Sequence, residues 1–169
     1  KDFIRNIILI IEDDKVLDVT ISIKKHIYEK RLAQKYLENS LVEVKDIFRE
    51  NYQDQIIMHM IIVNNDKNGN NSLLYSTNNN DDYLFLDVNF ISISNNFTFN
   101  LNKLFENQQI KIKRYMSGNY IKSYFGEDAT ELSAMANKLN NGLNKNEVQL
   151  VLKSSKNRGF FEKFFQLFS

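Results

Sequence analysis

The sequence predicts a doubly wound α/β domain built on a mainly parallel sheet. Two continuous apolar runs, NIILII (Asn6–Ile11) and IIMHMIIV (Ile56–Val63), have the composition of strands that are covered on both faces. Segments with apolar residues at helical spacing separate such runs along the chain. This alternation is typical of a parallel sheet with helices on both faces.

Each element follows from local periodicity, turn residues and candidate helix caps. The order that we expect is strand, helix, weak strand, helix, strand, loop, strand, short helix, one or two strands, and a final helix. The corresponding segments are Asn6–Ile11, Lys15–Ile27, Tyr28–Gln34, Tyr36–Asn51, Ile56–Val63, Asn64–Asn71, Tyr83–Ser92, Phe97–Glu106, Ile110–Phe125 and Gly126–Leu143. Gly142 is expected near the end of the last helix.

Bulk composition bounds the functional classes. The 169 residues suit one domain, and 22 Lys and Arg against 21 Asp and Glu leave a net charge of +1, which does not favour nucleic acid as a partner. The absence of cysteine excludes disulfides and thiolate metal sites. No apolar run reaches the roughly 20 residues of a membrane helix, and the first run ends in acids, unlike a signal peptide. We therefore expect a cytoplasmic protein.

Three motifs follow one another along residues 5–140: IIEDD at the end of the first strand, IIMHMIIVNNDKNG, and SGNYIKSYFGEDATEL near the end. Their order and spacing carry a resemblance to the receiver domain of response regulators. It implies a five-stranded, mainly parallel sheet in flavodoxin-like order, a three-layer sandwich with a C-terminal appendage. We expect a receiver-like domain over residues 1–142 and a tail over residues 143–169.

The resemblance also implies a site at the carboxyl ends of the strands. Glu12 and Asp13 match the acidic pair that binds Mg²⁺, a cation that prefers oxygen ligands. Ser92, with Ser94 as a substitute, and Lys122 match the hydroxyl and the cation that contact the phosphoryl group. Lys122 has an equally plain alternative as the ion-pair partner of Asp13. A residual Mg²⁺ site at Glu12 and Asp13 is the only cofactor that we expect, if any.

His59 stands where the family has its phosphorylated aspartate. Imidazole removes one negative charge and one hard oxygen ligand, so we expect a pseudo-receiver that is not phosphorylated on aspartate. Three interpretations of His59 remain open. It is an inert neutral histidine bonded to Glu12 or Asp13, a pH- or ligand-responsive switch, or a phosphohistidine or metal ligand.

The tail carries a cluster of aromatic residues at helical spacing. We expect it to fold back on the domain, to bind a partner or second copy, or to lie on a membrane surface. The cluster comprises Phe160, Phe161, Phe164, Phe165, Leu167 and Phe168. Tyr120, which we also expect among the partner-binding residues, occupies the position of the aromatic switch residue of receivers, although buried packing is the plainer account.

The functional prediction is regulatory protein–protein interaction without catalysis. The partner or dimer mate is expected to bind the last strand and helix, about Arg114–Leu139, and the tail. The alternatives are a structural subunit of a larger assembly, anchored by the tail, and a two-component response regulator that is still phosphorylated. An unrelated α/β enzyme is the least supported, because no Gly-rich phosphate loop or nucleophile motif is present.

Overall fold

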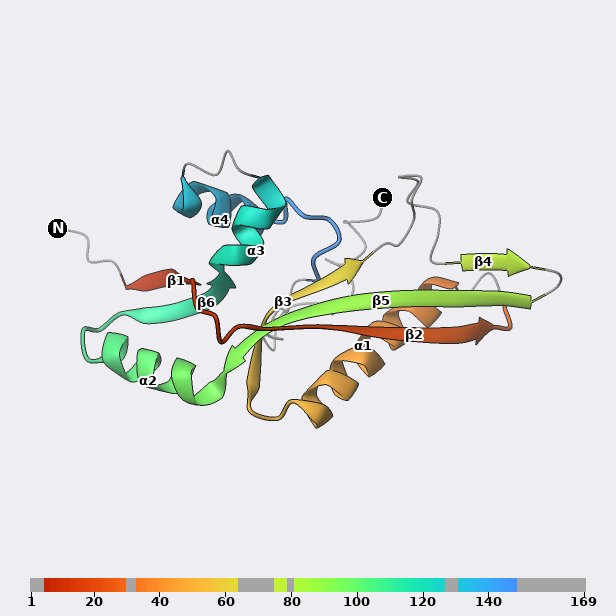
Figure 1. Ribbon diagram of the computed structural model, residues 1–169, viewed down its shortest axis with the longest axis horizontal. Coiled ribbons are helices and arrows are strands. Elements are labelled where there is room, and N and C mark those ends of the chain that lie inside the picture. The colour runs from red at the N-terminus through yellow and green to blue at the C-terminus, as the bar shows by residue number, and fades with distance from the viewer. Residues whose placement is uncertain (1–4, 30–32, 64–74, 79–80, 127–130, 149–169) are drawn as a thin grey trace, which may run out of the picture. The chain divides into compact units, whose positions relative to one another are not determined.

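A computed structural model describes residues 5–29, 33–63, 75–78, 81–126 and 131–148. These residues form a mixed α/β fold (Figure 1). The strands are β1 (Asn6–Ile11), β2 (Leu17–Ile27), β3 (Gln55–Val63), β4 (Tyr75–Asn78), β5 (Asp81–Ser94) and β6 (Lys111–Ser117). The helices are α1 (Ala33–Asn51), α2 (Asn95–Glu106), α3 (Gly118–Phe125) and α4 (Leu132–Asn140).

The chain divides into two compact units whose segments interleave in sequence. The first unit comprises residues 1–18, 54–59 and 91–144, and the second comprises residues 19–53, 60–90 and 145–169. Strands β2, β3 and β5 each cross from one unit into the other.

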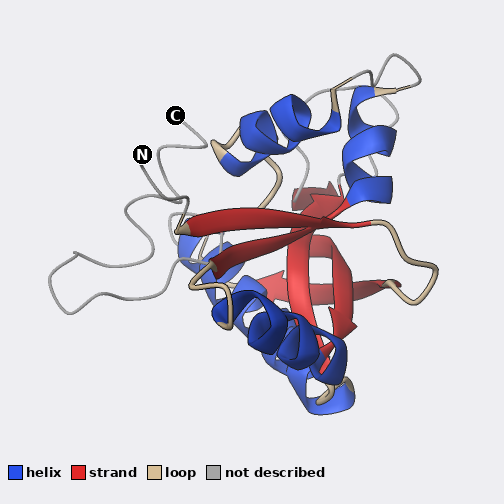
Figure 2. Cartoon of the chain, turned by 90° about the vertical axis from the view of Figure 1, so that its left-hand side faces the viewer, coloured by secondary structure: helices blue, strands red, loops and turns tan. Residues whose placement is uncertain are grey.

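The first unit contains a two-stranded parallel sheet. β1 pairs with β6 from Asn6 opposite Lys111 to Ile11 opposite Ser117, with a shift in register between Ile7 and Ile8. α2 flanks β6 on one side, and α3 and α4 lie on the other (Figure 2). The buried apolar side chains of this unit include Ile11, Met116, Ile121, Ala136 and Leu139.

The end of α4 follows the pattern that the sequence predicts. The N–H of Gly142 donates to the carbonyl of Leu139 at 2.9 Å, and Gly142 has a φ of +87°. A side chain is disfavoured in this left-handed region, so glycine is the residue that ends a helix most easily here.

The second sheet has the order β2-β5-β3, and β4 also pairs with β5. The β4–β5 pair is antiparallel, with Tyr75 opposite Leu84. Side-chain contacts show that β2 and β5 are antiparallel too. Thr20 contacts Asn89, Lys24 lies over Phe85, and His26 contacts Tyr83. The residue numbers thus rise along β2 while those of the contacted residues fall along β5. β5 runs opposite to β2 and β3 in Figure 1.

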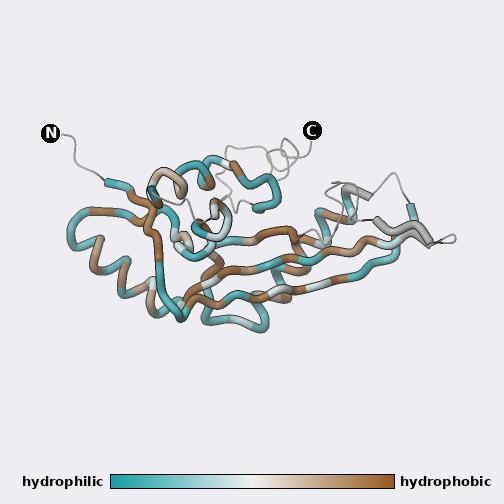
Figure 3. The backbone as a smooth tube through the Cα atoms, turned by 45° about the horizontal axis from the view of Figure 1, so that its top comes forward, coloured by the Kyte–Doolittle hydropathy of each residue, from teal (hydrophilic) through white to brown (hydrophobic). Residues whose placement is uncertain are grey.

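One face of β5 forms the core of the second unit. Leu84, Leu86, Val88 and Phe90 are each 0% exposed. Phe48 of α1, also 0% exposed, stacks on Phe90 with ring centroids 4.5 Å apart. The alternation of apolar and polar residues that produces one buried face can be followed along the long strands in Figure 3.

The expected helix over Lys15–Ile27 is wrong, because Leu17–Ile27 forms β2. Val19, Ile21 and Ile23 alternate with polar residues, and this period of two is the pattern of a strand. The β-branched side chains of this segment also favour extended backbone. The apolar set fits a helix only if this strict alternation is overlooked.

The expected five-stranded, mainly parallel sheet is not formed by the described residues. Their strands form a two-stranded parallel sheet and a four-stranded sheet that contains antiparallel pairs. Part of the difference arises because Leu17–Ile27 is a strand and not the expected helix, so β2 pairs with β5 in the sheet. The mixed α/β class is confirmed.

Other elements agree with the sequence more closely. The strands expected at Asn6–Ile11, Ile56–Val63 and Tyr83–Ser92 and the helices expected at Tyr36–Asn51 and Phe97–Glu106 are confirmed. The weak strand expected at Tyr28–Gln34 is wrong at its end, because α1 begins at Ala33. The segment Ile110–Phe125 forms a strand and a helix, and the final helix is shorter than expected.

Most of the expected tail, residues 149–169, lies outside the described residues, including its phenylalanine cluster. The boundary between residues 142 and 143 therefore stays a prediction. Just after it, the carbonyl of Asn146 accepts from the N–H of Ile62, and the N–H of Val148 donates to the carbonyl of Met60. Within the described part of the chain, no helix is long and apolar enough to cross a membrane.

Candidate functional site

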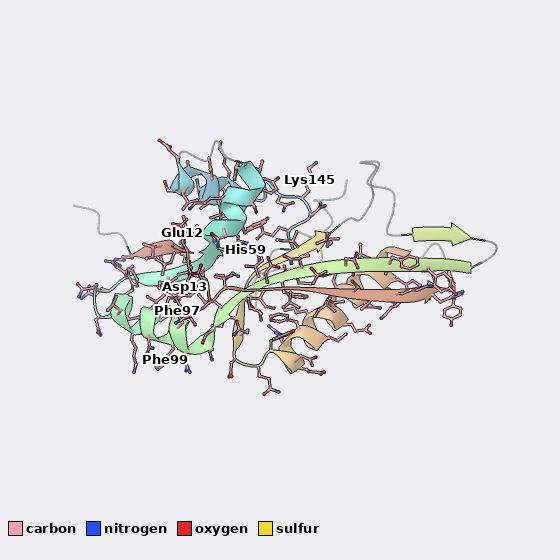
Figure 4. All side chains as sticks on the ribbon, in the orientation of Figure 1. Glu12, Asp13, His59, Phe97, Phe99 and Lys145 are labelled. Carbon is pink, nitrogen blue, oxygen red and sulfur yellow. The ribbon has the colours of Figure 1, made fainter. Side chains whose placement is uncertain are left out.

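The candidate site lies where β1 and β6 end in the first unit. Because these strands are parallel and Ile11 is opposite Ser117, their carboxyl ends lie side by side. Glu12 follows β1, and α3 starts directly after β6 at Gly118. We call Glu12, His59, Ser117, Gly118, Tyr120 and Lys122 the α3 cluster, and Figure 4 labels Glu12 and His59 within it.

Glu12 and Lys122 form an ion pair within this cluster. The Lys122 ammonium contacts Oε1 of Glu12, and the two side chains are 52% and 47% exposed. As an alternative role for Lys122, the sequence predicts an ion pair with Asp13. The structure contains such an ion pair, but the acid is the neighbouring Glu12. At this exposure, water screens the pair and limits its contribution to about 0–1 kcal/mol.

Gly118 is the residue that lets Glu12 approach α3. A Cβ atom added at Gly118 would lie 2.4 Å from Cγ of Glu12 and 3.1 Å from its Cδ. Both distances are shorter than carbon atoms tolerate without displacement. The absence of a side chain at Gly118 therefore sets the position of the Glu12 carboxylate above the first turn of the helix.

Asp13 is engaged in the turn that follows β1. Its Oδ1 accepts a hydrogen bond of 2.7 Å from the N–H of Lys15, and its carbonyl accepts one of 3.3 Å from the N–H of Val16. A short carboxylate that bonds the backbone two residues later is a common way to stabilise a turn. Glu12 and Asp13 are thus adjacent, but each already has a partner in the protein.

His59 is buried, with 1% of its surface exposed. Its Nε2 accepts a hydrogen bond of 2.9 Å from the backbone N–H of Ser117. An accepting nitrogen carries no proton, so this geometry corresponds to a neutral ring with its proton on Nδ1. The sequence predicts Glu12 or Asp13 as the partner of a neutral histidine. In the structure, the partner of Nε2 is instead the backbone N–H of Ser117.

Tyr120 packs its ring against His59 with centroids 4.4 Å apart. It is 9% exposed, its backbone N–H donates to Oγ of Ser117 at 3.3 Å, and its hydroxyl accepts from Nδ2 of Asn144 at 2.8 Å. Tyr120 is thus mostly buried, and its expected partner-binding role stays a prediction. Tyr124, one turn later, is 41% exposed.

Ser92, the expected phosphoryl-contacting hydroxyl, has a different environment. It is 0% exposed on β5, and its Oγ donates to Oε1 of Gln55 on β3 at 3.2 Å. This hydroxyl thus makes a cross-strand bond between buried or half-buried side chains. The structure brings together Glu12, His59, Tyr120 and Lys122 of the predicted residues, and it places Asp13 in the adjoining turn.

Sequence reasoning missed Ser117 and Gly118. Ser117 caps α3, because its side chain accepts from the N–H of Tyr120 and its backbone is extended. Serine followed by a helical segment is a recognisable capping signal, and it stands in the sequence at the end of the apolar run of β6. The pattern of Ile110–Phe125 predicts one or two strands, and this prediction hides the cap.

The described residues contain no group of three or more His, Cys, Asp or Glu side chains arranged to hold a metal ion. The carboxylate of Glu12 faces an ammonium group, and His59 uses one ring nitrogen as an acceptor for the backbone. The cluster thus satisfies its charges and its buried polar atoms within the protein. This arrangement suits a structural junction between a strand end and a helix start.

A scan against protein-family models finds no match, and a search of curated proteins finds no significant match.

Proposed function

We propose that this chain is a regulatory protein–protein interaction module without catalytic activity. The observation that carries the proposal is the pairing inside the α3 cluster. Lys122 contacts Glu12, and Nε2 of His59 accepts from Ser117. Glu12 and Lys122, which phosphoryl transfer would need as a metal ligand and a point charge, are engaged with each other. His59, at the position of the nucleophile, is engaged by the backbone of Ser117.

The relation to receiver domains is part of this proposal and is supported by the order of the motifs and by one contact. The motifs occur in the receiver order, and two of the implied residues, Glu12 and Lys122, are in contact. The flavodoxin-like sheet order is not part of the proposal, because the strands of the described residues are arranged differently. The proposed interaction depends on the α3 cluster and on exposed side chains. It does not depend on whether the fold is related to receiver domains.

The exposed side of α3 is the surface that we propose for the partner. Lys122 and Tyr124 are exposed there, while Gly118, Tyr120 and Ile121 are buried and hold the helix in place. Aromatic side chains such as Tyr124 are enriched at protein interfaces. The apolar stem of Lys122 can also be covered by a partner while its ammonium group stays in water.

The absence of phosphoryl transfer is tested by incubation with acetyl phosphate and Mg²⁺ followed by intact mass measurement. We expect no added phosphate, whereas an authentic receiver domain treated in parallel should show the acid-stable, base-labile adduct. A phosphate adduct on this chain would overturn the non-catalytic part of the proposal and favour the phosphorylated response regulator.

The interaction surface is tested by affinity capture with two matched variants. Tyr124→Ser removes an aromatic that is 41% exposed on α3, and Phe99→Ser removes one that is 55% exposed on α2. We expect the first variant to lose the specific partner and the second to retain it. If both variants retain it but deletion of residues 156–169 abolishes capture, the tail is the anchor and the structural-subunit alternative is favoured.

A further inference from the structure

The edge of the second sheet offers a surface for strand pairing. Among the described residues, β2 has β5 as its strand neighbour and stands at the end of the order β2-β5-β3. It is 11 residues long, about twice the usual strand length. An edge strand of this length presents a row of backbone N–H and C=O groups that another strand can bind.

The two faces of β2 differ in character. Asp18, Thr20, Ser22 and Lys24 are exposed, and they alternate with apolar residues that point to the α1 side. The apolar set, Val19, Ile21 and Ile23, is only half-buried, whereas the β5 residues on the same face are completely buried. A strand added beyond β2 would therefore also cover apolar side chains that the edge leaves partly exposed.

We propose that β2 pairs antiparallel with β2 of a second copy of this chain, about a two-fold axis through Ile21. In this register the sequence complements itself. Asp18 stands opposite Lys24 of the second copy, and symmetry produces that charge pair twice. Thr20 stands opposite Ser22 and Val19 opposite Ile23, so polar residues meet on the exposed face and apolar residues on the α1 side.

Neighbouring registers lack this complementarity. An axis between two residues would place the apolar face of one copy beside the polar face of the other, because the side-chain period of a strand is two. An axis at Ser22 would place Lys24 opposite Thr20 and Lys25 opposite Val19. An axis at Thr20 would place Lys24 opposite Val16, which precedes the strand. The charge pair therefore selects the axis at Ile21.

The geometry of Lys24 is compatible with this role. Its ammonium lies 4.2 Å from the ring centroid of Tyr83 and 5.1 Å from that of Phe85, so it is held on the exposed face of the sheet. Lys25 points to the other side and is paired with Glu43 of α1. Only Lys24 of these two lysines is on the face of Asp18, as the proposed pairing requires.

The first experiment measures molecular mass by sedimentation equilibrium from micromolar to near-millimolar concentration. We expect a monomer–dimer equilibrium that weakens with added salt. Lys24→Asp and Asp18→Lys each place like charges opposite one another twice, so each variant should raise the dissociation constant about tenfold or more. The double variant D18K/K24D exchanges the charges and should restore the wild-type value.

Restoration is the decisive outcome, because it depends on the register and not on net charge. The circular dichroism of each variant serves as the control for folding. A wild-type chain that stays monomeric throughout the range overturns the proposal. Single variants that dimerise like the wild type, or a double variant as weak as the single ones, overturn the register.

A cross-linking experiment provides a second readout, since the chain contains no cysteine. Thr20→Cys and Ser22→Cys are on the exposed face, where each should tolerate substitution. Opposite residues have Cα atoms about 4.5–5.5 Å apart, within disulfide range. A mixture of the two variants should cross-link on mild oxidation more than either variant alone; equal cross-linking in all three samples would contradict the pairing.

Discussion

The backbone N–H of Ser117 donates a hydrogen bond of 2.9 Å to Nε2 of His59, and both residues are almost completely buried. The bond ties β3 to the point where β6 ends and α3 begins. Ser117 also caps the helix through its side chain. His59 thus supplies the acceptor for the backbone of the residue that starts α3.

Replacement of His59 should therefore destabilise the protein through the N–H that loses its acceptor. In His59→Leu the buried donor of Ser117 stays unsatisfied, which costs about 1–3 kcal/mol. His59→Gln retains a side-chain acceptor and should lose less. Urea denaturation of the two variants checks the expectation, and equal losses would show that packing against Tyr120, not the hydrogen bond, determines the stability.

Gly118 should control the ion pair beside it. In Gly118→Ala the new Cβ displaces the Glu12 side chain, so the coupling between Glu12 and Lys122 should vanish. The free energy of unfolding should change by less than about 1 kcal/mol. The loss of the ion pair is offset by the helix preference of alanine over glycine, which is of similar size. A double-mutant cycle with Glu12→Gln and Lys122→Met, measured with Gly and with Ala at position 118, checks the coupling.

Gly126 provides a contrasting control for the same substitution. It has a φ of +79° with a ψ of −169°, and an added Cβ would have nothing within 4 Å. Gly126→Ala should thus be destabilising through backbone strain alone, by about 1–3 kcal/mol. The Glu12–Lys122 coupling should survive in this variant. Loss of coupling in both variants would mean that Gly118→Ala acts through general destabilisation.

The proximity of Lys122 to Glu12 should also weaken any Mg²⁺ binding at Glu12 and Asp13. A divalent cation must displace the ammonium group or share the carboxylate with it, and like charges repel. Removal of the amine in Lys122→Met should therefore increase Mg²⁺ affinity. Isothermal titration with MgCl₂ compares the variant with the wild type, and Glu12→Gln in the same background should abolish the gain. An unchanged affinity in Lys122→Met would contradict this account.

The sequence identifies individual elements better than their arrangement. The apolar runs of β1, β3 and β5 and the helical spacing of α1 and α2 are local signals, so they predict these elements directly. The segment that becomes β2 contains a local signal too, the alternation around Ile21, but its many apolar residues also fit a helical face. Strand order has no such local signature, because it depends on which surfaces pack together.

The site shows the same limit. The family resemblance brought Glu12, His59 and Lys122 together, and the structure places them in one cluster. It did not identify the partner of His59, because a backbone N–H carries no sequence signature. The close approach of Glu12 to Gly118 depends on the exact position of β1 beside β6, which the residues by themselves do not specify.

Tyr115 of β6 has a titration behaviour that reports on the packing of α2. Its hydroxyl lies 2.8 Å from Oδ1 of Asn102 and 3.2 Å from the carbonyl oxygen of Thr98, both on α2. Burial, and secondarily the negative charge of Glu106, raises the pKa of Tyr115 above its ordinary value. The folded protein therefore favours the neutral phenol, which is the form that donates the hydrogen bond.

This shift predicts a loss of stability in alkaline solution. Because the folded pKa is raised, the stabilisation is fully present below the unfolded pKa of about 10 and disappears as the pH rises through the folded value. At neutral pH Tyr115→Phe should cost about 0.5–1.5 kcal/mol for the lost hydrogen bond. The difference in unfolding free energy between wild type and variant should shrink above this unfolded pKa, because the unfolded wild type then ionises more readily than the folded one. Urea denaturation at a series of pH values measures it, and a difference that stays constant with pH would show that Tyr115 does not carry the effect.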